Sequence, residues 1–478
     1  MRTIARFFTY IAQRYLPDAF IFLFFLTLLV FVLGMLQGSG PLEVLDYWGG
    51  GFFDILEFTM QSTLMLVTGF ALANTPPVHR GLRTFARLPR NEVQVIVLTV
   101  LSMMVFSWIS WGFGLIAGAI VCREMGIVHR GRVHYPLLVA ATYAGFLVWH
   151  AGYGGSIPQL IATPGHFLEG QMGVIPVVET IFAPVTLIIV LALAVVIPIV
   201  MALMRPRSDE ERVDLPEEIL EEEEELTHER AASGDETHDE EEEGELTHER
   251  SPSGDETHGG AETKTAPEAR TQPVVAARLE HSRLITLIFG AMGLLWLISY
   301  FAGGGLLNIN IAIFTFLVAG LLLIPNAREY LNQVMGGARA AYGIILQFPF
   351  YAAIFGILEG TGLVHTIADF FIYISSANTL PFWAFISGGI INMFAPSGGG
   401  QWAVQGPIMV EAAAQLNADM GKTAMGLAWG DAWTNMIQPF WTLPLLAIAG
   451  LSIRDIMGYT AVVLIISGVV IGAGLLIL

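Results

Sequence analysis

The stretch from Asn392 to Pro407, NMFAPSGGGQWAVQGP, interrupts an apolar segment with a proline, a serine and three consecutive glycines. A second stretch, from Gly152 to Gly165 (GYGGSIPQLIATPG), does the same in the first half of the chain. Unpaired backbone polar groups are costly in hydrocarbon, so irregular backbone persists at membrane depth only where protein buries it or where it lines a cavity. Two such interruptions, in opposite halves of a polytopic protein, are typical of the central site of a secondary transporter.

The composition indicates an integral membrane protein. Of the 478 residues, 54% are hydrophobic and 14% are charged, whereas about a quarter of the residues of a soluble domain are charged. The formal net charge of −19 arises from one segment, because 26 of the 42 acidic residues lie between Arg205 and Arg283. This local acidity is no sign of a basic partner, and we expect no nucleic-acid partner. The single cysteine, Cys122, excludes a disulfide within the chain.

Apolar runs of about 20 residues, the length needed to cross a bilayer, occur nine times along the chain. Two further apolar segments, 93–122 and 382–415, are interrupted at their middles by Ser110-Trp111-Gly112 and by Pro396-Ser397-Gly398-Gly399-Gly400. Each half of these segments is too short to cross comfortably, which favours re-entrant hairpins. The sequence therefore predicts an all-α polytopic membrane protein with about nine transmembrane helices and two opposed re-entrant hairpins in an inverted repeat.

The distribution of basic residues orients this topology. With the N-terminus inside, the arginine-rich loops all fall on one face, and Lys422 is the one cation on the other. This positive-inside bias predicts a multi-pass protein of the cytoplasmic membrane, with the N-terminus in the cytoplasm. Three regions follow: a first membrane half, 1–204, with the hairpin 93–122 and a broken span 136–165; a linker, 205–283; and a second half, 284–478, with the hairpin 382–415 and a broken span 422–450.

The linker 205–283 contains an internal repeat. Glu225-Leu-Thr-His-Glu-Arg230 recurs as Glu245-Leu-Thr-His-Glu-Arg250. Acidic runs and few large apolar residues leave such a segment unable to bury a core. We expect a disordered acidic tether on the cytoplasmic side, and the spaced histidines and acids are too weak a pattern to predict a metal site.

The two hairpin tips are candidate binding sites for an anionic oxygen. A turn at Ser110, Trp111 and Gly112 aims the N-terminus of the returning half-helix, with its free N–H groups, at the membrane centre. The alternative is that these glycines only permit close helix packing. The second tip is richer in donors, since consecutive glycine N–H groups form an anion nest to which serine and amide side chains add. Its candidate substrate-binding residues are Asn392, Ser397, Gly398, Gly399, Gly400, Gln401 and Trp402.

The interrupted spans supply the other candidates. In the first half, Ser156 and Thr163 offer hydroxyl groups to a substrate. In the second half, Asp431 is the acid placed well inside a span, and intramembrane carboxylates serve as proton relays or cation ligands when they are not paired structurally. The residues predicted to bind the coupling ion, H⁺ or Na⁺, are Asp431, Thr434, Asn435 and Gln438. His150, at a span break, is expected to be structural rather than part of the site.

Motifs of other chemistries are missing from the sequence. It has no Walker A pattern, no HExxH, no GxSxG and no Cys/His spacing typical of zinc. We therefore expect neither an enzyme nor an ATP-driven pump, with no catalytic residue, no metal site and no cofactor apart from the coupling ion.

At these residues the chain resembles the bacterial short-chain fatty acid (acetoacetate/butyrate) transporter family. The motifs that carry the resemblance run in order through both halves and include Trp111-Gly-Phe-Gly114, Ser156-Ile-Pro158 with Ala162-Thr-Pro-Gly165, Gln347-Phe-Pro-Phe-Tyr351, Ala395-Pro-Ser-Gly-Gly-Gly400 and Gln438-Pro-Phe-Trp441. Two departures are the long acidic linker and His150, which stands where a small residue is expected.

The resemblance implies uptake of short monocarboxylates with a cation, by a fold similar to the ion-transporter superfamily. It also implies a homodimer, with membrane lipid as the other partner, that works by an elevator-like movement of the hairpin domain. From the residues we expect the substrate carboxylate at Ser397–Gly400 and its alkyl tail against Trp111, Phe113 and Trp402. Two alternatives stay open: a carrier for another small anion such as a dicarboxylate, and a membrane sensor that uses the acidic linker.

Overall fold

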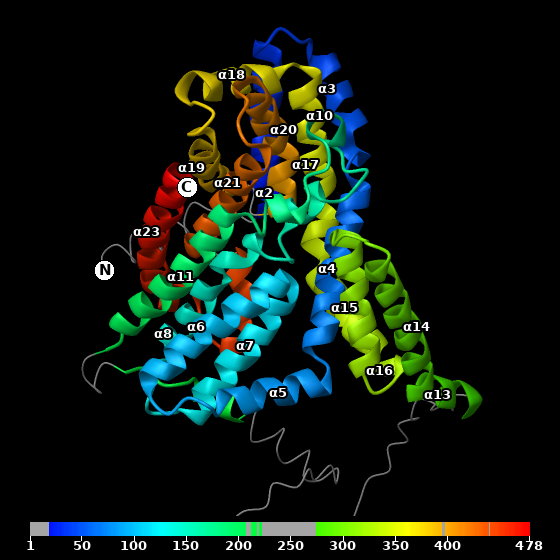
Figure 1. The fold of residues 1–478 in the computed structure, drawn as a ribbon, viewed down its shortest axis with the longest axis vertical. Helices are drawn as coiled ribbons and strands as arrows, with labels where there is room; N and C mark the ends of the chain where they lie inside the picture. Colours follow the sequence, from blue (N-terminus) through cyan, green and yellow to red (C-terminus); the bar gives the residue numbers. More distant parts are fainter. Residues whose placement is uncertain (1–18, 207–211, 218, 222–273, 394–396, 439) are drawn as a thin grey trace, which may run out of the picture.

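The fold is built from helices. The computed structural model describes residues 19–206, 212–217, 219–221, 274–393, 397–438 and 440–478, and within these residues all regular structure is helical (Figure 1). This confirms the predicted all-α class. In this part of the chain seven helices are long and apolar enough to cross a membrane: α4 (Leu56–Ala73), α6 (Glu92–Ile109), α7 (Trp111–Val128), α11 (Pro184–Leu203), α14 (Arg283–Ala302), α17 (Tyr342–Gly360) and α23 (Ile453–Ile477).

The outer surface of these helices is suited to lipid. On α14, for example, Phe289 is 59% exposed and Leu295 is 67% exposed. A helix that presents large apolar side chains on its outside is stable in hydrocarbon and not in water. The chain is thus a multi-pass membrane protein, while the count of nine spans stays a prediction.

Two helix pairs occupy the segments predicted as hairpins. Helices α6 and α7 meet at Ser110, and α19 (Leu380–Asn392) is followed by α20 (Gly398–Leu416). The argument from length does not hold for the first pair, because α6 and α7 have 18 residues each, or about 27 Å at 1.5 Å per residue. Length therefore permits either helix of the first pair to cross, and the re-entrant path of both pairs stays a prediction.

The helix that follows each pair is broken. After the first pair, α8 (Tyr135–Gly145) continues as a 3-10 turn, η2 (Phe146–Ala151), and the backbone is irregular until α9 (Ser156–Ile161). After the second pair, α21 (Met420–Thr434) passes into η5 (Asn435–Ile437), and helix resumes at η6 (Phe440–Thr442) and α22 (Leu443–Ala449). Glycines at the first break and a proline at the second interrupt the helical hydrogen bonding, and burial in protein makes the freed backbone groups tolerable.

The remaining helices include four that the sequence analysis missed. These four are short and carry polar residues on one face, so they contain no continuous apolar run: α3 (Pro41–Gly50), α5 (Pro76–Ala86), α16 (Ala327–Ala340) and α18 (Leu363–Ile374). The others are α2 (Ala19–Leu36), η1 (Gly51–Phe53), α10 (Glu169–Met172), η3 (Val177–Glu179), α13 (Val274–Glu280) and α15 (Ile309–Leu323).

The arrangement brings the two pairs together end to end. In Figure 1, α6 and α7 lie in the lower part of the molecule, and α19 and α20 lie in the upper part. Helix α4 packs against α7, α15 and α16, and α17 packs against α2, α3 and α20. The pairs and broken helices therefore stand beside a second group of helices, in which α4 and α5 contact α7, and α17 and α18 contact α20.

The start of the linker differs from the prediction. Leu215 and Ile219 are each 5% exposed, and Tyr135 N donates a 2.9 Å hydrogen bond to Val213 O. Residues 212–217 and 219–221 are thus packed on the membrane part of the protein, because two apolar residues four positions apart give this short piece a face to bury. The sequence repeat lies outside the described residues.

Candidate functional site

The first tip is a capped helix start pressed against its neighbours. Ser110 is the N-cap of α7, and its Oγ accepts a hydrogen bond from Phe113 N at 3.4 Å. Gly112 lies against Leu66 of α4, where an added Cβ would come within 3.0 Å of that side chain. A Cβ on Gly154, in the first break, would lie 2.5 Å from Ser110 Cα. The tip is therefore fitted between α4 and the break of its own half, and Ser110 is fully buried.

The second tip repeats this construction. Ser397 is the N-cap of α20, and its Oγ accepts a hydrogen bond from Gly400 N at 3.3 Å. The first N–H groups of a helix have no partner within the helix, and no hydrogen bond from the N–H of Gly398 or Gly399 is present in the described part of the chain. The tip therefore offers unpaired donors and the positive end of a 19-residue helix.

Aromatic rings enclose the three glycines of the second tip. An added Cβ on Gly398 would lie 2.4 Å from His150 Cε1. A Cβ on Gly399 would lie 2.3 Å from Phe58 Cε1, and one on Gly400 would lie 2.4 Å from Tyr351 Cδ2. Real Cβ atoms do not approach other atoms this closely, so glycine is required at all three positions. We call His150, Phe58 and Tyr351, together with Trp149 and Phe348, the aromatic collar.

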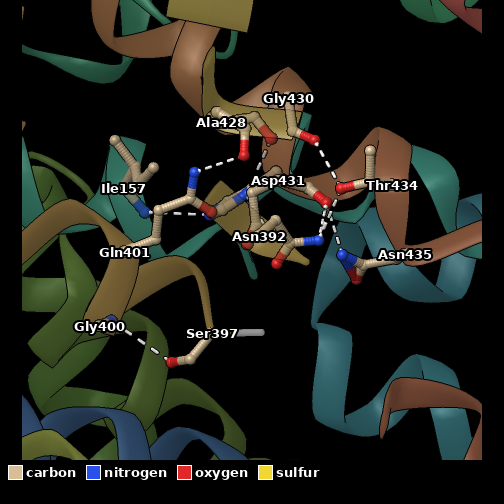
Figure 2. A network of polar contacts seen from close by, with 12 residues as sticks. Ile157, Asn392, Ser397, Gly400, Gln401, Ala428, Gly430, Asp431, Thr434 and Asn435 are labelled. Atoms are coloured by element: carbon tan, nitrogen blue, oxygen red, sulfur yellow. Dashed lines mark hydrogen bonds and ion pairs between the residues drawn. The ribbon is translucent and has the colours of Figure 1, made fainter. Parts of the chain in front are cut away.

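A polar centre joins the end of α19 to the second break (Figure 2). Asn392 Nδ2 donates to Asp431 O at 2.8 Å and to Thr434 Oγ1 at 2.9 Å. Asn435 Nδ2 also donates to Asp431 O, and Tyr143 OH donates to Asn435 O at 2.9 Å. The freed backbone carbonyls of the break are thus satisfied by side chains from α19 and α8, which explains how the break persists inside the protein.

Several side-chain oxygens of this centre have no hydrogen-bond donor among the described residues. These are the Oδ1 atoms of Asp431, Asn392 and Asn435, whose side chains are all 0% exposed, while Asp431 Oδ2 lies 3.2 Å from His150 Nδ1. A buried unpaired polar atom costs about 1–3 kcal/mol, and more when it is charged. Carboxylate and amide oxygens are ligands suited to a hard cation, and a carboxylate also takes a proton. The described residues hold no cluster of three His, Cys, Asp or Glu for a metal such as zinc.

His150 lies beside the polar centre and is hydrogen-bonded there, as a structural residue would be, and a role in the site stays untested. Its Nε2 accepts the N–H of Ile157 at 3.4 Å and its Nδ1 lies 3.0 Å from Ala428 O, so the proton is on Nδ1 and points at this carbonyl. Nδ1 also lies 3.2 Å from Asp431 Oδ2, and both side chains are fully buried. His150 therefore touches both broken helices and, through Gly398, the second tip.

Trp149 links the two tips. Its ring lies 6.4 Å from that of Trp111, at the first tip, and its Cη2 would come within 3.0 Å of a Cβ on Gly398, at the second. Trp111 also contacts Trp441, from the second break, at 5.1 Å between ring centroids. Nothing in the sequence singles out Trp149, because one more aromatic residue in an apolar span is ordinary.

The remaining predicted residues lie around this centre with different roles. Gln401 Nε2 donates to Gly388 O at 2.7 Å and leaves its own Oε1 unpaired. Gln438, which caps η5, also has an unpaired oxygen. The Trp402 ring lies over Gly406 of its own helix. Ser156 is half-buried at the start of α9.

Thr163 is a correction to the predicted site. Its hydroxyl has a single proton, which it donates to Gln159 O at 2.7 Å, and its oxygen accepts a hydrogen bond from Ile309 N at 3.3 Å. It also lines a separate cavity of about 120 Å³ with Asp54 and His166. Thr163 therefore fastens α9 to the start of α15 and has no proton left for a substrate. Burial lowers the pKa of His166 in this loop, although its bond to the Gly173 carbonyl opposes the effect.

These features define a class: a multi-pass α-helical membrane protein in which two capped helix starts and two broken helices surround a closed, polar centre. Comparison with known proteins agrees with this class. A family model described as short chain fatty acid transporter matches residues 1–247 and 258–478. The chain belongs to the short-chain fatty acid transporter family, and it is a transporter.

Two relatives support the assignment, and one solved structure shares the fold. A protein of Escherichia coli (strain K12) is 40% identical over 474 residues, covering 99% of this chain and 98% of the relative. One of Haemophilus influenzae (strain Rd) is 34% identical over 481 residues, with the same coverage of both chains. Both carry short-chain fatty acid transporter as a provisional name. The crystal structure of the Alcanivorax borkumensis YdaH transporter matches with a TM-score of 0.53 at 14% identity, covering 96% of this chain and 98% of that one, which shows a shared fold.

Proposed function

We propose that this transporter moves short monocarboxylates such as butyrate and acetoacetate across the cytoplasmic membrane, coupled to the entry of H⁺ or Na⁺. One observation carries the proposal: the unpaired N–H groups of the second tip lie beside a buried centre of unpaired oxygens. The first set of groups suits an anion and the second a cation. A site that holds both together is what symport requires.

The substrate carboxylate is assigned to the second tip. Ser397 accepts the Gly400 N–H and keeps its own hydroxyl proton for a substrate oxygen. The N–H groups of Gly398 and Gly399 add two more donors, and the collar rings of Phe58 and Phe348 provide an apolar surface for a short alkyl tail. The first tip, at Ser110, Trp111 and Gly112, stands across Trp149 and completes the enclosure.

The coupling ion is assigned to the polar centre. Asp431, Thr434, Asn435 and Gln438 stay our proposal for the residues that bind it, and Asn392 Oδ1 adds a further unpaired oxygen. In the proposed orientation the N-terminus and the acidic linker face the cytoplasm. A homodimer in lipid is the assembly that we propose.

The proposed binding residues are closed off from solvent, which constrains how a substrate enters. Ser397 is 9% exposed, and Asn392, Asp431 and Asn435 are 0% exposed. Substrate entry therefore requires the tip to move relative to the collar, and α4 and α17, which supply Phe58 and Tyr351, are the helices past which it moves.

Uptake into proteoliposomes tests the proposal. Radiolabelled butyrate is supplied under an imposed pH gradient and, separately, under an imposed Na⁺ gradient, with succinate as the dicarboxylate comparison. We expect gradient-driven accumulation of butyrate and little of succinate, because the described site residues include no arginine or lysine to balance a second carboxylate. Folded protein that accumulates butyrate under neither gradient refutes the proposed function.

A further inference from the structure

Tyr351 is a buried phenol whose hydroxyl has no hydrogen-bond partner among the described residues. It lies on α17, outside both helix pairs and both broken helices. Its side chain is 0% exposed, and its hydroxyl is among the buried polar atoms without a partner. A phenol O–H that is buried normally finds an acceptor, because leaving it unpaired is costly. An unpaired hydroxyl beside a proposed binding site is a donor available to a substrate.

The ring position places this hydroxyl at the second tip. The Cδ2 and Cε2 atoms of Tyr351 would lie 2.4 Å and 2.5 Å from a Cβ on Gly400. The hydroxyl is bonded to the next ring carbon after Cε2, so it stands beside the first turn of α20. The Asp431 carboxylate lies instead beside His150, whose Nδ1 is 3.2 Å from Oδ2. Among the described residues the Tyr351 hydroxyl therefore makes no hydrogen bond to the polar centre.

Another buried tyrosine near the centre shows the contrast. The hydroxyl of Tyr143 donates to Asn435 O at 2.9 Å and so has a structural use. At the tip, the capping bond from Gly400 N to Ser397 Oγ leaves the Gly398 and Gly399 N–H groups and the Ser397 proton for a ligand. A carboxylate has two oxygens with about four lone-pair sites, which can accept from several donors at once.

We infer that Tyr351 is a further substrate-binding residue, whose hydroxyl donates a hydrogen bond to the substrate carboxylate held at Ser397–Gly400. This inference rests on the proposed function and adds a residue from α17 to the site. It also assigns specificity, because a donor matched to a charged oxygen favours a carboxylate over a neutral amide of the same shape. Substrate bound in this way bridges α17 to the second tip.

Butyrate exchange in proteoliposomes, with Tyr351→Phe, tests the inference. Exchange of labelled for unlabelled butyrate measures substrate binding and translocation without net ion movement. The variant keeps the ring that packs on Gly400 and removes only the hydroxyl. Loss of a hydrogen bond to a charged group predicts a rise in KM of about tenfold to a hundredfold. Competition by butyramide, weak in the wild type, should approach that by butyrate in the variant.

Tyr135→Phe is the matched control. Tyr135 is 1% exposed and its hydroxyl is also unpaired, but its ring lies against Gly126, away from the tips. This variant should exchange butyrate with the wild-type KM. An unchanged KM in Tyr351→Phe, or an altered dependence on the driving ion alone, overturns the role of Tyr351. Failure of the wild-type protein itself to exchange butyrate overturns the proposed function and this inference with it.

Discussion

Replacing Gly398 by alanine tests whether the second tip is fitted against His150. The new Cβ would lie 2.4 Å from His150 Cε1 and 2.6 Å from its Nε2. The imidazole has little room to retreat, since it stacks on Trp149 with 3.8 Å between ring centroids and its Nδ1 is bonded to Ala428 O at 3.0 Å. Forced overpacking of this kind costs about 1–3 kcal/mol. We therefore expect a lower temperature of thermal unfolding and slower butyrate exchange.

A control variant and a double variant test whether the effect of Gly398→Ala comes from the clash with His150. Gly81, on α5, has open space around its would-be Cβ, and Gly81→Ala should be neutral or stabilising by about 0.5–1 kcal/mol. In the double variant Gly398→Ala/His150→Ala the ring that clashes is absent. The losses of unfolding free energy in the two single variants should therefore not add, and their coupling energy should be about 1 kcal/mol or more. A Gly398→Ala protein that unfolds at the wild-type temperature refutes the reasoning, as does strict additivity.

Three further changes probe the polar centre and the linker. Asn435→Ala removes an amide whose Nδ2 donates to Asp431 O and whose Oδ1 is unpaired. Uptake of labelled butyrate should fall at least tenfold while expression stays normal. Normal uptake would exclude a role of Asn435 in ion binding. Deletion of residues 222–262 should leave uptake intact, because none of the proposed binding residues lies among them; a sensor that uses the linker would instead lose its output. Ile219→Ser replaces a buried apolar side chain, 5% exposed and packed near Gly450, with a small polar one. The free energy of unfolding should fall by about 1.5–3 kcal/mol. An unchanged unfolding temperature would contradict the packing of Ile219 on the membrane part of the protein.

The parts of the fold that the sequence predicted correctly depend on local chemistry. A serine before a glycine-rich turn is a good N-cap, and Ser110 and Ser397 begin α7 and α20. The glycines from Gly152 to Gly155 mark the first break, whereas Gly430 lies inside α21 and the second break begins only at Asn435. Asp431 is conspicuous in an apolar span for its charge alone.

What the sequence could not predict depends on tertiary packing. Tyr351 reads as one aromatic residue among many in an apolar helix, and only the approach of Gly400 reveals its place. His150 follows an ordinary span, and its position beside Asp431 results from contact between residues 281 positions apart. Thr163 donates its one proton to Gln159 O, and its oxygen accepts a hydrogen bond from Ile309 N, in the other half of the chain. The acidic residues around Leu215 and Ile219 make this segment look unable to bury a core, so the sequence does not predict that these two side chains are packed.

Thiol labelling at the second tip tests most directly where the substrate binds. Cys122 is buried, so Ser397→Cys introduces one thiol that becomes reactive when the tip opens. With butyrate present, labelling by a small maleimide should slow, with half-protection at the concentration that half-saturates exchange, and butyramide should protect far less. Labelling that butyrate leaves unchanged, in protein that still exchanges butyrate, would contradict a substrate carboxylate at Ser397–Gly400.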